Sequence, residues 1–209
     1  IGLSSGCGVI ISQYYGARDQ NAVSKSVHTA LAFSLLSGVV IMVLGLLLTD
    51  FSLRAMSLPE EIMPEATAYL RIFFLGMIPN LFYNMGAAVL RAIGDSKRPL
   101  YFLILSCLCN IVLDLIFVAY LRLGVSGAAL ATILSQLASA VMVLFVLLRT
   151  KSDVRLIPSQ LRLDPFWLKK MIYVGLPAGL QSTMYTVSNI IVQATINSFG
   201  TNTIAAVTA

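Results

Sequence analysis

Residues 99–121 read PLYFLILSCLCNIVLDLIFVAYL, a run of 23 residues in which Asp114 is the only charged side chain. About 20 apolar residues in a helix, rising about 1.5 Å each, cross the hydrocarbon core of a bilayer. This stretch is therefore predicted to span a membrane with one carboxylate inside it. An ionisable group near the bilayer centre costs at least about 2.5 kcal/mol, so Asp114 is expected to serve a function.

Similar apolar runs lie on both sides of this stretch. Complete spans are predicted at 26–48, 66–92, 99–121, 124–148 and 170–199, with a broken span at 1–15 and a further start at 204–209. The composition agrees, because 58% of the 209 residues are hydrophobic and 11% are charged, against about 25% charged in a soluble domain. The sequence therefore predicts an all-α polytopic membrane protein. Its ends, both inside apolar runs, predict a piece of a longer protein.

The basic residues fall mostly on one side of the predicted membrane. If the spans alternate in direction, segments 16–27, 91–98 and 149–170 share a side and hold eleven of the fourteen Lys and Arg residues. These are Arg18, Lys25, Arg91, Lys97, Arg98, Arg149, Lys151, Arg155, Arg162, Lys169 and Lys170. Because cytoplasmic loops are rich in Lys and Arg, this side is predicted to face the cytoplasm from the plasma membrane. A basic surface facing the anionic lipid bilayer explains the net charge of +5 better than nucleic acid does.

The longest loop, 149–169, joins two groups of spans. It contains an amphipathic segment that is expected to form a short interfacial helix beginning near Asp164 and Pro165. Trp167 then fits the aromatic belt at the level of the lipid headgroups. A simple linker is the alternative for this segment.

Asp114 has polar neighbours that suit a hard cation. Asn110 lies four residues earlier on the same helix face. Asp114 precedes the outer end of its span by eight residues and Thr132 follows the start of the next span by eight, which predicts a similar depth on antiparallel helices. Carboxylate, amide and hydroxyl oxygens suit Na⁺ or a proton relay, and no other metal or cofactor is expected. The three residues are therefore predicted to bind a cation, with an interhelical hydrogen-bond cluster as the alternative.

Other polar side chains in the spans are candidates for the wall of a substrate cavity. They are Asn80 and Asn84 after Pro79, Gln136 one turn from Thr132, and the stripe Gln181, Tyr185 and Asn189 after Pro177. Prolines permit kinks, and kinked helices mark moving parts in transporters. Packing contacts between helices are the alternative reading of each stripe.

The chain lacks the usual constellations of an enzyme or a transition-metal site. His28 is its only histidine, at a predicted cytoplasmic helix start, and Cys107 and Cys109 point away from each other on a helix. No Ser-His-Asp set or carboxylate pair is present. These residues disfavour an intramembrane enzyme.

Four segments resemble the MATE transporters (multidrug and toxic compound extrusion). SQYYGARD at 12–19 resembles the loop after helix two, and RAIGDSKRP at 91–99 resembles the loop between helices four and five. GVSGAALAT at 124–132 is similar to the entry of helix six, and GLPAGLQ at 175–181 to the start of helix seven. Their spacing agrees with the family order, and the resemblance covers the whole chain.

The resemblance implies twelve helices in two six-helix lobes, of which this chain holds about half. Residues 1–148 are then the end of helix two through helix six of the amino-terminal lobe. Residues 149–169 become the cytoplasmic connector between the lobes, and 170–209 become helix seven and the start of helix eight. The resemblance also implies export of cationic or amphipathic compounds, driven by inward Na⁺ or H⁺, with no obligatory protein partner.

The resemblance also implies site residues. The branch called DinF-like has a cation site of an Asn and an Asp four apart on helix five and a Thr on helix six, which match Asn110, Asp114 and Thr132. An Asp on helix one of that branch falls outside this chain. The NorM-like branch has a Glu eight residues after the helix-seven Pro, where this chain has Tyr185. The chain therefore resembles the DinF-like branch more than the NorM-like one.

Three functions remain to be compared. The first is a cation-coupled multidrug antiporter. The second is a lipid-linked oligosaccharide flippase of the same wider superfamily, which needs cationic residues in its cavity to meet a pyrophosphate. The spans are nearly free of Lys and Arg, which disfavours the flippase. The third is an intramembrane enzyme.

Overall fold

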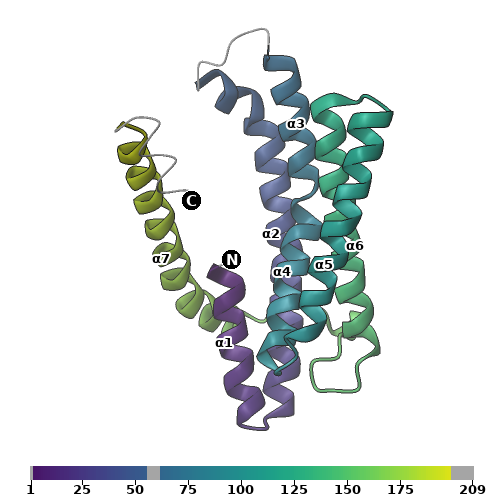
Figure 1. Ribbon diagram of the computed structural model, residues 1–209. Helices are drawn as coiled ribbons and strands as arrows, with labels where there is room; N and C mark the ends of the chain where they lie inside the picture. The colour runs from purple at the N-terminus through teal and green to yellow at the C-terminus, as the bar shows by residue number, and fades with distance from the viewer. Residues whose placement is uncertain (1, 56–61, 199–209) are drawn as a thin grey trace.

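The computed structural model describes residues 2–55 and 62–198, all of whose regular elements are helical (Figure 1). The elements are α1 (Gly2–Gly16), α2 (Gln20–Ala55), α3 (Met63–Leu75), α4 (Met77–Ala92), α5 (Lys97–Asp114), a π-helical segment η1 (Leu115–Tyr120), α6 (Gly124–Arg149), a 3₁₀ turn η2 (Pro158–Gln160) and α7 (Pro165–Ser198). The predicted start of a span at 204–209 lies outside the described residues. Within them, the all-helical prediction is confirmed.

The predicted spans differ in how apolar they are. Among the described residues, α2, α5 with η1, and α6 are long and apolar enough to cross a membrane, and α3 with α4 forms a fourth span if the pair counts as one. The predicted span at 170–199 lies in α7, which is long enough but is not among these helices. Polar residues interrupt α7, including Ser182, Thr183 and Thr186. A helix of this composition suits a position beside a cavity rather than one surrounded by lipid.

The predicted single span at 66–92 is two helices. α3 and α4 meet at Gly76 and are bent by 41° relative to each other. Pro79 explains the position of the break, because a proline ring clashes with the carbonyl four residues before it, here that of Leu75, the last residue of α3. At the break, the Gly76 amide donates to the carbonyl three residues earlier, that of Phe73, at 3.0 Å.

The interfacial helix predicted in the loop 149–169 is not a separate element. The residues assigned to it are the first turns of α7, which continues to Ser198. The predicted start is confirmed: Pro165 is the first residue of α7, and the Asp164 carboxylate accepts a hydrogen bond from the Phe166 amide at 3.0 Å. Trp167 is only 7% exposed and packs edge-on against Tyr14, so its ring is buried in the core, and its level in the membrane stays a prediction.

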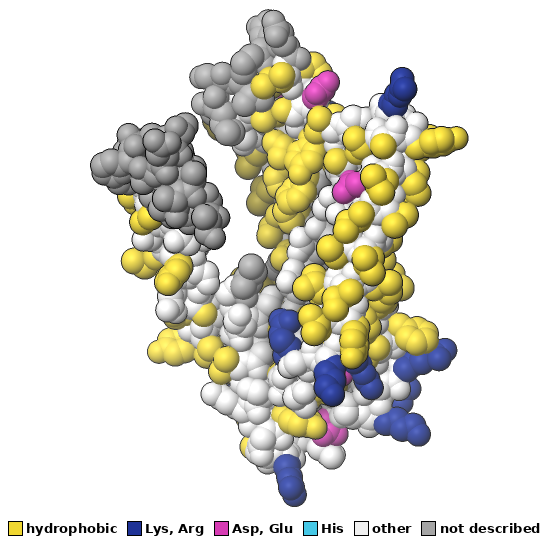
Figure 2. Space-filling model, viewed as in Figure 1, with side chains coloured by type: hydrophobic (Ala, Val, Ile, Leu, Met, Phe, Trp, Pro, Cys, Tyr) yellow, Lys and Arg dark blue, Asp and Glu magenta, His cyan; other side chains and the backbone are white. Residues whose placement is uncertain are grey.

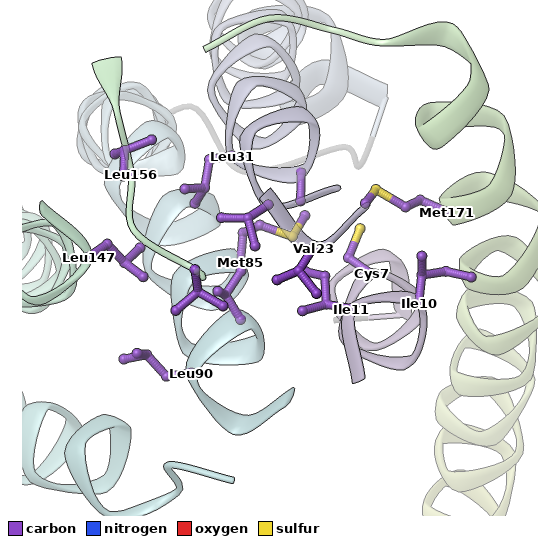
Figure 3. Packing of buried hydrophobic residues seen from close by; sticks show 14 of the residues in the cluster. Cys7, Ile10, Ile11, Val23, Leu31, Met85, Leu90, Leu147, Leu156 and Met171 are labelled. Carbon is purple, nitrogen blue, oxygen red and sulfur yellow. The ribbon is translucent and has the colours of Figure 1, made fainter. Parts of the chain in front are cut away.

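The hydrophobic core lies at one end of the molecule. It joins α1, α2, α4, α6, the connector and α7 through side chains such as Ile11, Leu31, Leu90, Leu147 and Met171 (Figure 3). Most of the Lys and Arg side chains visible in Figure 2 gather at this same end, which we call the basic end. α3 and η1, which reach the opposite end, contain no buried residue. The chain is therefore packed tightly at its basic end and more loosely at the other.

Candidate cation site and membrane cavity

A buried hydrogen bond fixes the register of α5 against α6. Ser106 Oγ on α5 donates to the Ser135 carbonyl on α6 at 2.7 Å. One turn along each antiparallel helix from this contact, Asn110 lies level with Thr132. Asp114 lies about one further turn toward the opposite end. This register offsets the backbone of Asp114 by about one turn from that of Thr132, and a shared cation site of the two side chains stays a prediction.

A π-helical segment follows Asp114. The prediction assumed a regular α-helix from Pro99 to Leu121, whereas the backbone becomes π-helical directly after Asp114. The Leu121 amide, for example, donates to the Ile116 carbonyl five residues earlier, at 2.8 Å. π-Turns inside α-helices are rare and are frequent at functional sites. The segment Leu115–Tyr120 contains ordinary apolar residues, so the sequence held no signal for it.

Asn110 and Asp114 each hold a buried polar atom without a partner. Among the described residues, Asn110 Nδ2 and Asp114 Oδ1 are the buried side-chain atoms that make no hydrogen bond. Leaving such an atom unpaired costs about 1–3 kcal/mol, and more for a charged group. A cation or a proton bound to the Asp114 oxygen removes this cost, which fits the predicted binding of Na⁺ or H⁺. The Thr132 hydroxyl makes no hydrogen bond to this oxygen and donates instead to the Ala128 carbonyl at 2.9 Å.

Replacing Ser106 with Ala tests the register. We expect a loss of stability of about 0.6 kcal/mol, the usual size of an interhelical hydrogen bond in a membrane. The measurement is the thermal unfolding midpoint of the full-length protein in detergent. Ser12→Ala is the control, because the exposed Ser12 hydroxyl bonds only within its own helix, to the Val9 carbonyl. Equal midpoints for the two variants would contradict the register.

Two of the predicted cavity residues, Asn80 and Gln136, lie near the bend between α3 and α4, and Asn84 lies one turn farther along α4. Asn84 Nδ2 donates to Asn80 Oδ1 at 2.6 Å and to the Asn80 carbonyl at 2.9 Å. Gln136 reaches the bend from α6, because its Oε1 would lie only 3.2 Å from a Cβ added to Gly76. All three residues are half-buried, and none of them lines the cavity described next.

A cavity of about 540 Å³ lies between α7 and the helices α1, α2 and α4. Figure 2 shows a hollow between α7 and the rest of the molecule. Its α7 wall includes Ser182, Thr183 and Thr186, and its α2 wall includes Phe33 and Ser37. The wall contains no Lys, Arg, Asp or Glu among the described residues.

The cavity uses a different face of α7 from the predicted one. Gln181, Tyr185 and Asn189 are exposed and do not line it. The predicted stripe consists of larger polar side chains, whereas the lining includes the neighbouring hydroxyl residues Ser182 and Thr186, which were not predicted. The sequence contained one signal for Ser182 and Thr186, because their spacing of four residues places both hydroxyls on one helix face after Pro177. A role in substrate binding stays a prediction for the Gln181 stripe.

α1 and α7 touch through their backbones at the closed side of this cavity. Gly2 and Gly6 are four residues apart on α1, as Gly175 and Gly179 are on α7. A Cβ on Gly6 would lie 2.5 Å from the Gly175 nitrogen and 3.2 Å from the Met171 carbonyl oxygen. Small residues at this spacing allow membrane helices to approach closely. We call the contact of these four residues the glycine seam.

Comparisons with known proteins agree with this architecture. The MatE family model matches residues 1–116. The chain is 33% identical over 213 residues to "Probable multidrug resistance protein YoeA" of Bacillus subtilis, an alignment that covers 99% of this chain and 46% of that relative. It thus spans about half the length of the curated relatives it matches. Relatives named for both branches are similar to this chain. "Probable multidrug resistance protein NorM" of Geobacillus kaustophilus is 26% identical, over 94% of this chain and 45% of the relative. "DNA damage-inducible protein F" of Escherichia coli is 28% identical, over 62% of this chain and 28% of the relative.

Solved structures give the same result for the fold. A crystal structure of MATE in the bent conformation superimposes with a TM-score of 0.88 and 30% identity, over 99% of this chain and 47% of that one. An outward-facing MATE transporter gives 0.86 and 30% over 95% of this chain and 44% of that one. An inward-facing MATE transporter gives 0.80 and 32% over 86% of this chain and 41% of that one. This chain is therefore a multi-pass membrane protein that belongs to the MatE family and covers about half of the MATE transporter fold.

Proposed function

We propose that the full-length protein is a cation-coupled antiporter that exports cationic or amphipathic compounds across the plasma membrane. The observation that carries this proposal is the unpaired carboxylate oxygen of Asp114, buried in an apolar span next to a π-helical segment. Binding of Na⁺ or H⁺ there neutralises the carboxylate and removes the cost of the unpaired oxygen. Relatives named for multidrug resistance support the export function.

Coupling requires that cation and substrate favour different conformations. The junction of α5 and η1 is our candidate for the element that responds, because π-turns in helices are frequent at functional sites. We propose Asn110 and Asp114 as the inner ligands of the cation. Thr132 completes the site only after α5 moves by about one turn relative to α6, or through a bridging water.

The conformation supports alternating access. The predicted lobes meet at the basic end through the glycine seam and the hydrophobic core, while the 540 Å³ cavity lies beside the diverging part of α7 (Figure 1). If the basic end faces the cytoplasm, this is a state closed toward the cytoplasm. Hydroxyl groups and an aromatic ring in the wall suit amphipathic substrates.

The residues favour a DinF-like site over a NorM-like one. Asp114 is present with a buried unpaired carboxylate oxygen, whereas position 185, where a NorM-like site has a Glu, is a Tyr that is 71% exposed. The flippase alternative needs cations to meet a pyrophosphate, and the cavity wall holds none among the described residues. Membership of the MatE family disagrees with the intramembrane enzyme.

Transport by the full-length protein in liposomes tests the proposal. A fluorescent organic cation is loaded into the vesicles, and its export is followed after a Na⁺ or H⁺ gradient is imposed. We expect one of the two gradients to drive export against the substrate gradient. Failure of both gradients would remove the antiporter assignment.

The side chain of Lys170 provides a second contact between α1 and α7. Its Nζ donates to Tyr14 Oη at 2.5 Å and lies 4.5 Å, 5.1 Å and 5.4 Å from the ring centroids of Phe166, Tyr14 and Trp167. Cation–π contacts contribute about 0.5–2 kcal/mol each. The contact therefore favours the state that is closed at the basic end.

Replacing Lys170 with Gln is expected to increase the population open at the basic end by about threefold or more, because a contact of about 0.7 kcal/mol corresponds to that factor. Spin labels on the basic ends of α1 and α7 of the full-length protein measure the population through their distance distribution. Lys169→Gln is the control, since Lys169 is exposed and makes none of these contacts. An unchanged distribution in Lys170→Gln would contradict the proposed contact.

A further inference from the structure

A polar cavity of about 330 Å³ lies at the basic end, between the first turns of α2 and the connector. All of its described lining residues are polar or charged, including Lys25 and His28 of α2 and Gln160, Arg162 and Asp164 of the connector. It shares no residue with the candidate cation site or with the cavity beside α7. Nothing in the proposed transport mechanism uses it.

His28 holds the two walls of this cavity together. Its Nδ1 lies 2.7 Å from the Ser24 carbonyl, which can only accept, so Nδ1 carries the proton. Nε2 is then free to accept a hydrogen bond from the Ile157 amide at 3.0 Å. The ring is 3% exposed. A second bond, from the Asp164 amide to Thr29 Oγ1 at 3.4 Å, fixes the other end of the connector segment.

The cavity has two cations on opposite walls and a single acid. Among the described residues, Lys25 and Arg162 form no ion pair; the pairs present are Arg71–Asp50 and Arg98–Asp95. The acid, Asp164, already accepts a hydrogen bond from the Phe166 amide. An anion between Lys25 and Arg162 would therefore meet a net positive charge, with hydroxyl and amide groups around it.

An apolar groove of about 350 Å³ adjoins the polar cavity along the connector. Its described lining is wholly apolar and includes Val141 and Leu144 of α6 and Leu161 of the connector. Residues of the connector divide between the two spaces: Ser159, Gln160 and Arg162 line the polar cavity, whereas Pro158 and Leu161 line the groove. A charged site and an apolar groove thus lie on either side of the same five-residue segment, 158–162.

We propose that these two spaces hold one anionic glycerophospholipid, with its phosphate between Lys25 and Arg162 and an acyl chain in the groove. A free phosphate uses only the polar cavity, and a neutral hydrocarbon uses only the groove. A lipid matches both, because it joins an anionic headgroup to an apolar chain. Basic pockets at the cytoplasmic side of membrane helices suit anionic headgroups. Such a lipid would fasten the connector to α2 and α6.

Retention of phosphatidylglycerol by the full-length protein tests the proposal. The purified protein is mixed with this lipid in detergent, and the bound lipid is counted by native mass spectrometry. We expect one retained lipid per chain. The variant Lys25→Gln/Arg162→Gln should retain at least fivefold less, and Val141→Trp, which fills the groove from an exposed position, at least threefold less.

Matched variants serve as controls. Lys97→Gln/Lys151→Gln removes two exposed cations outside the cavity, and Leu103→Trp enlarges an exposed apolar residue outside the groove. Both should retain the lipid as the wild type does. Equal retention by the test and control variants would overturn the proposal. So would full competition by millimolar inorganic phosphate together with unchanged retention in Val141→Trp, because that result assigns the site to a free anion.

Discussion

Replacing Asp114 with Asn in the full-length protein is expected to lower cation-driven export at least about tenfold, since coupling energies of about 1–3 kcal/mol correspond to factors of about 5–150. The Asn side chain has the shape of a protonated Asp and carries no charge, so it cannot be neutralised by the coupling cation. Export is measured in liposomes with the imposed gradient. Exchange of substrate in the absence of a gradient should fall much less, because that process needs only the cavity.

The control for this variant is Asp153→Asn. Asp153 is an acid of the connector and lies outside both the candidate cation site and the cavity beside α7. Its replacement removes the same charge by the same chemical change, and we expect export to stay within a factor of two of the wild type. If Asp114→Asn behaves like Asp153→Asn, the carboxylate in the membrane is not the coupling residue.

Replacing Gly6 with Ala is expected to disrupt the glycine seam. The new Cβ would meet the backbone of α7 at Gly175 and Met171, which cannot turn aside as a flexible side chain can. Overpacking of this kind costs about 1–3 kcal/mol, so the state closed at the basic end should lose about tenfold or more in population. The measurements are the α1–α7 distance distribution and the rate of export, and both should change.

Gly8 offers a matched control on the same helix. A Cβ on Gly8 would lie 3.6 Å from the Ala88 carbonyl oxygen and 3.8 Å from the Ala88 Cβ, which are ordinary contacts. Ala is a better helix former than Gly by up to about 1 kcal/mol, so Gly8→Ala should be neutral or stabilising. Opposite effects of the same substitution two residues apart would identify the seam. Similar effects at both positions would contradict it.

The membrane character of the chain could be predicted from the sequence because lipid imposes a simple requirement. A span needs a long apolar run, and the positions of Lys and Arg give its direction. For the same reason Asp114 stood out as the one charged residue in its span. The break at Gly76 was not predicted, although Pro79 carried part of the signal through its clash with the Leu75 carbonyl.

The other features depend on partners that are distant in the sequence. His28 accepts a hydrogen bond from an amide 129 residues later, and Gly6 meets Gly175 only because α7 crosses α1. The π-helical segment after Asp114 has an ordinary apolar sequence. The face of α7 that lines the cavity depends on how this helix is rotated against α1, and the stripe of Gln181, Tyr185 and Asn189 holds no information about that rotation.

Direct cation binding tests the central claim, that Asp114 is part of the site that couples a cation to transport. The full-length protein is held in lightly buffered detergent solution, and bound Na⁺ is counted with radioactive sodium while proton uptake is read from the pH. We expect the wild type to bind one Na⁺ or one H⁺ that Asp114→Asn does not bind. Equal binding of the same cation, with the same affinity, by both proteins would contradict it.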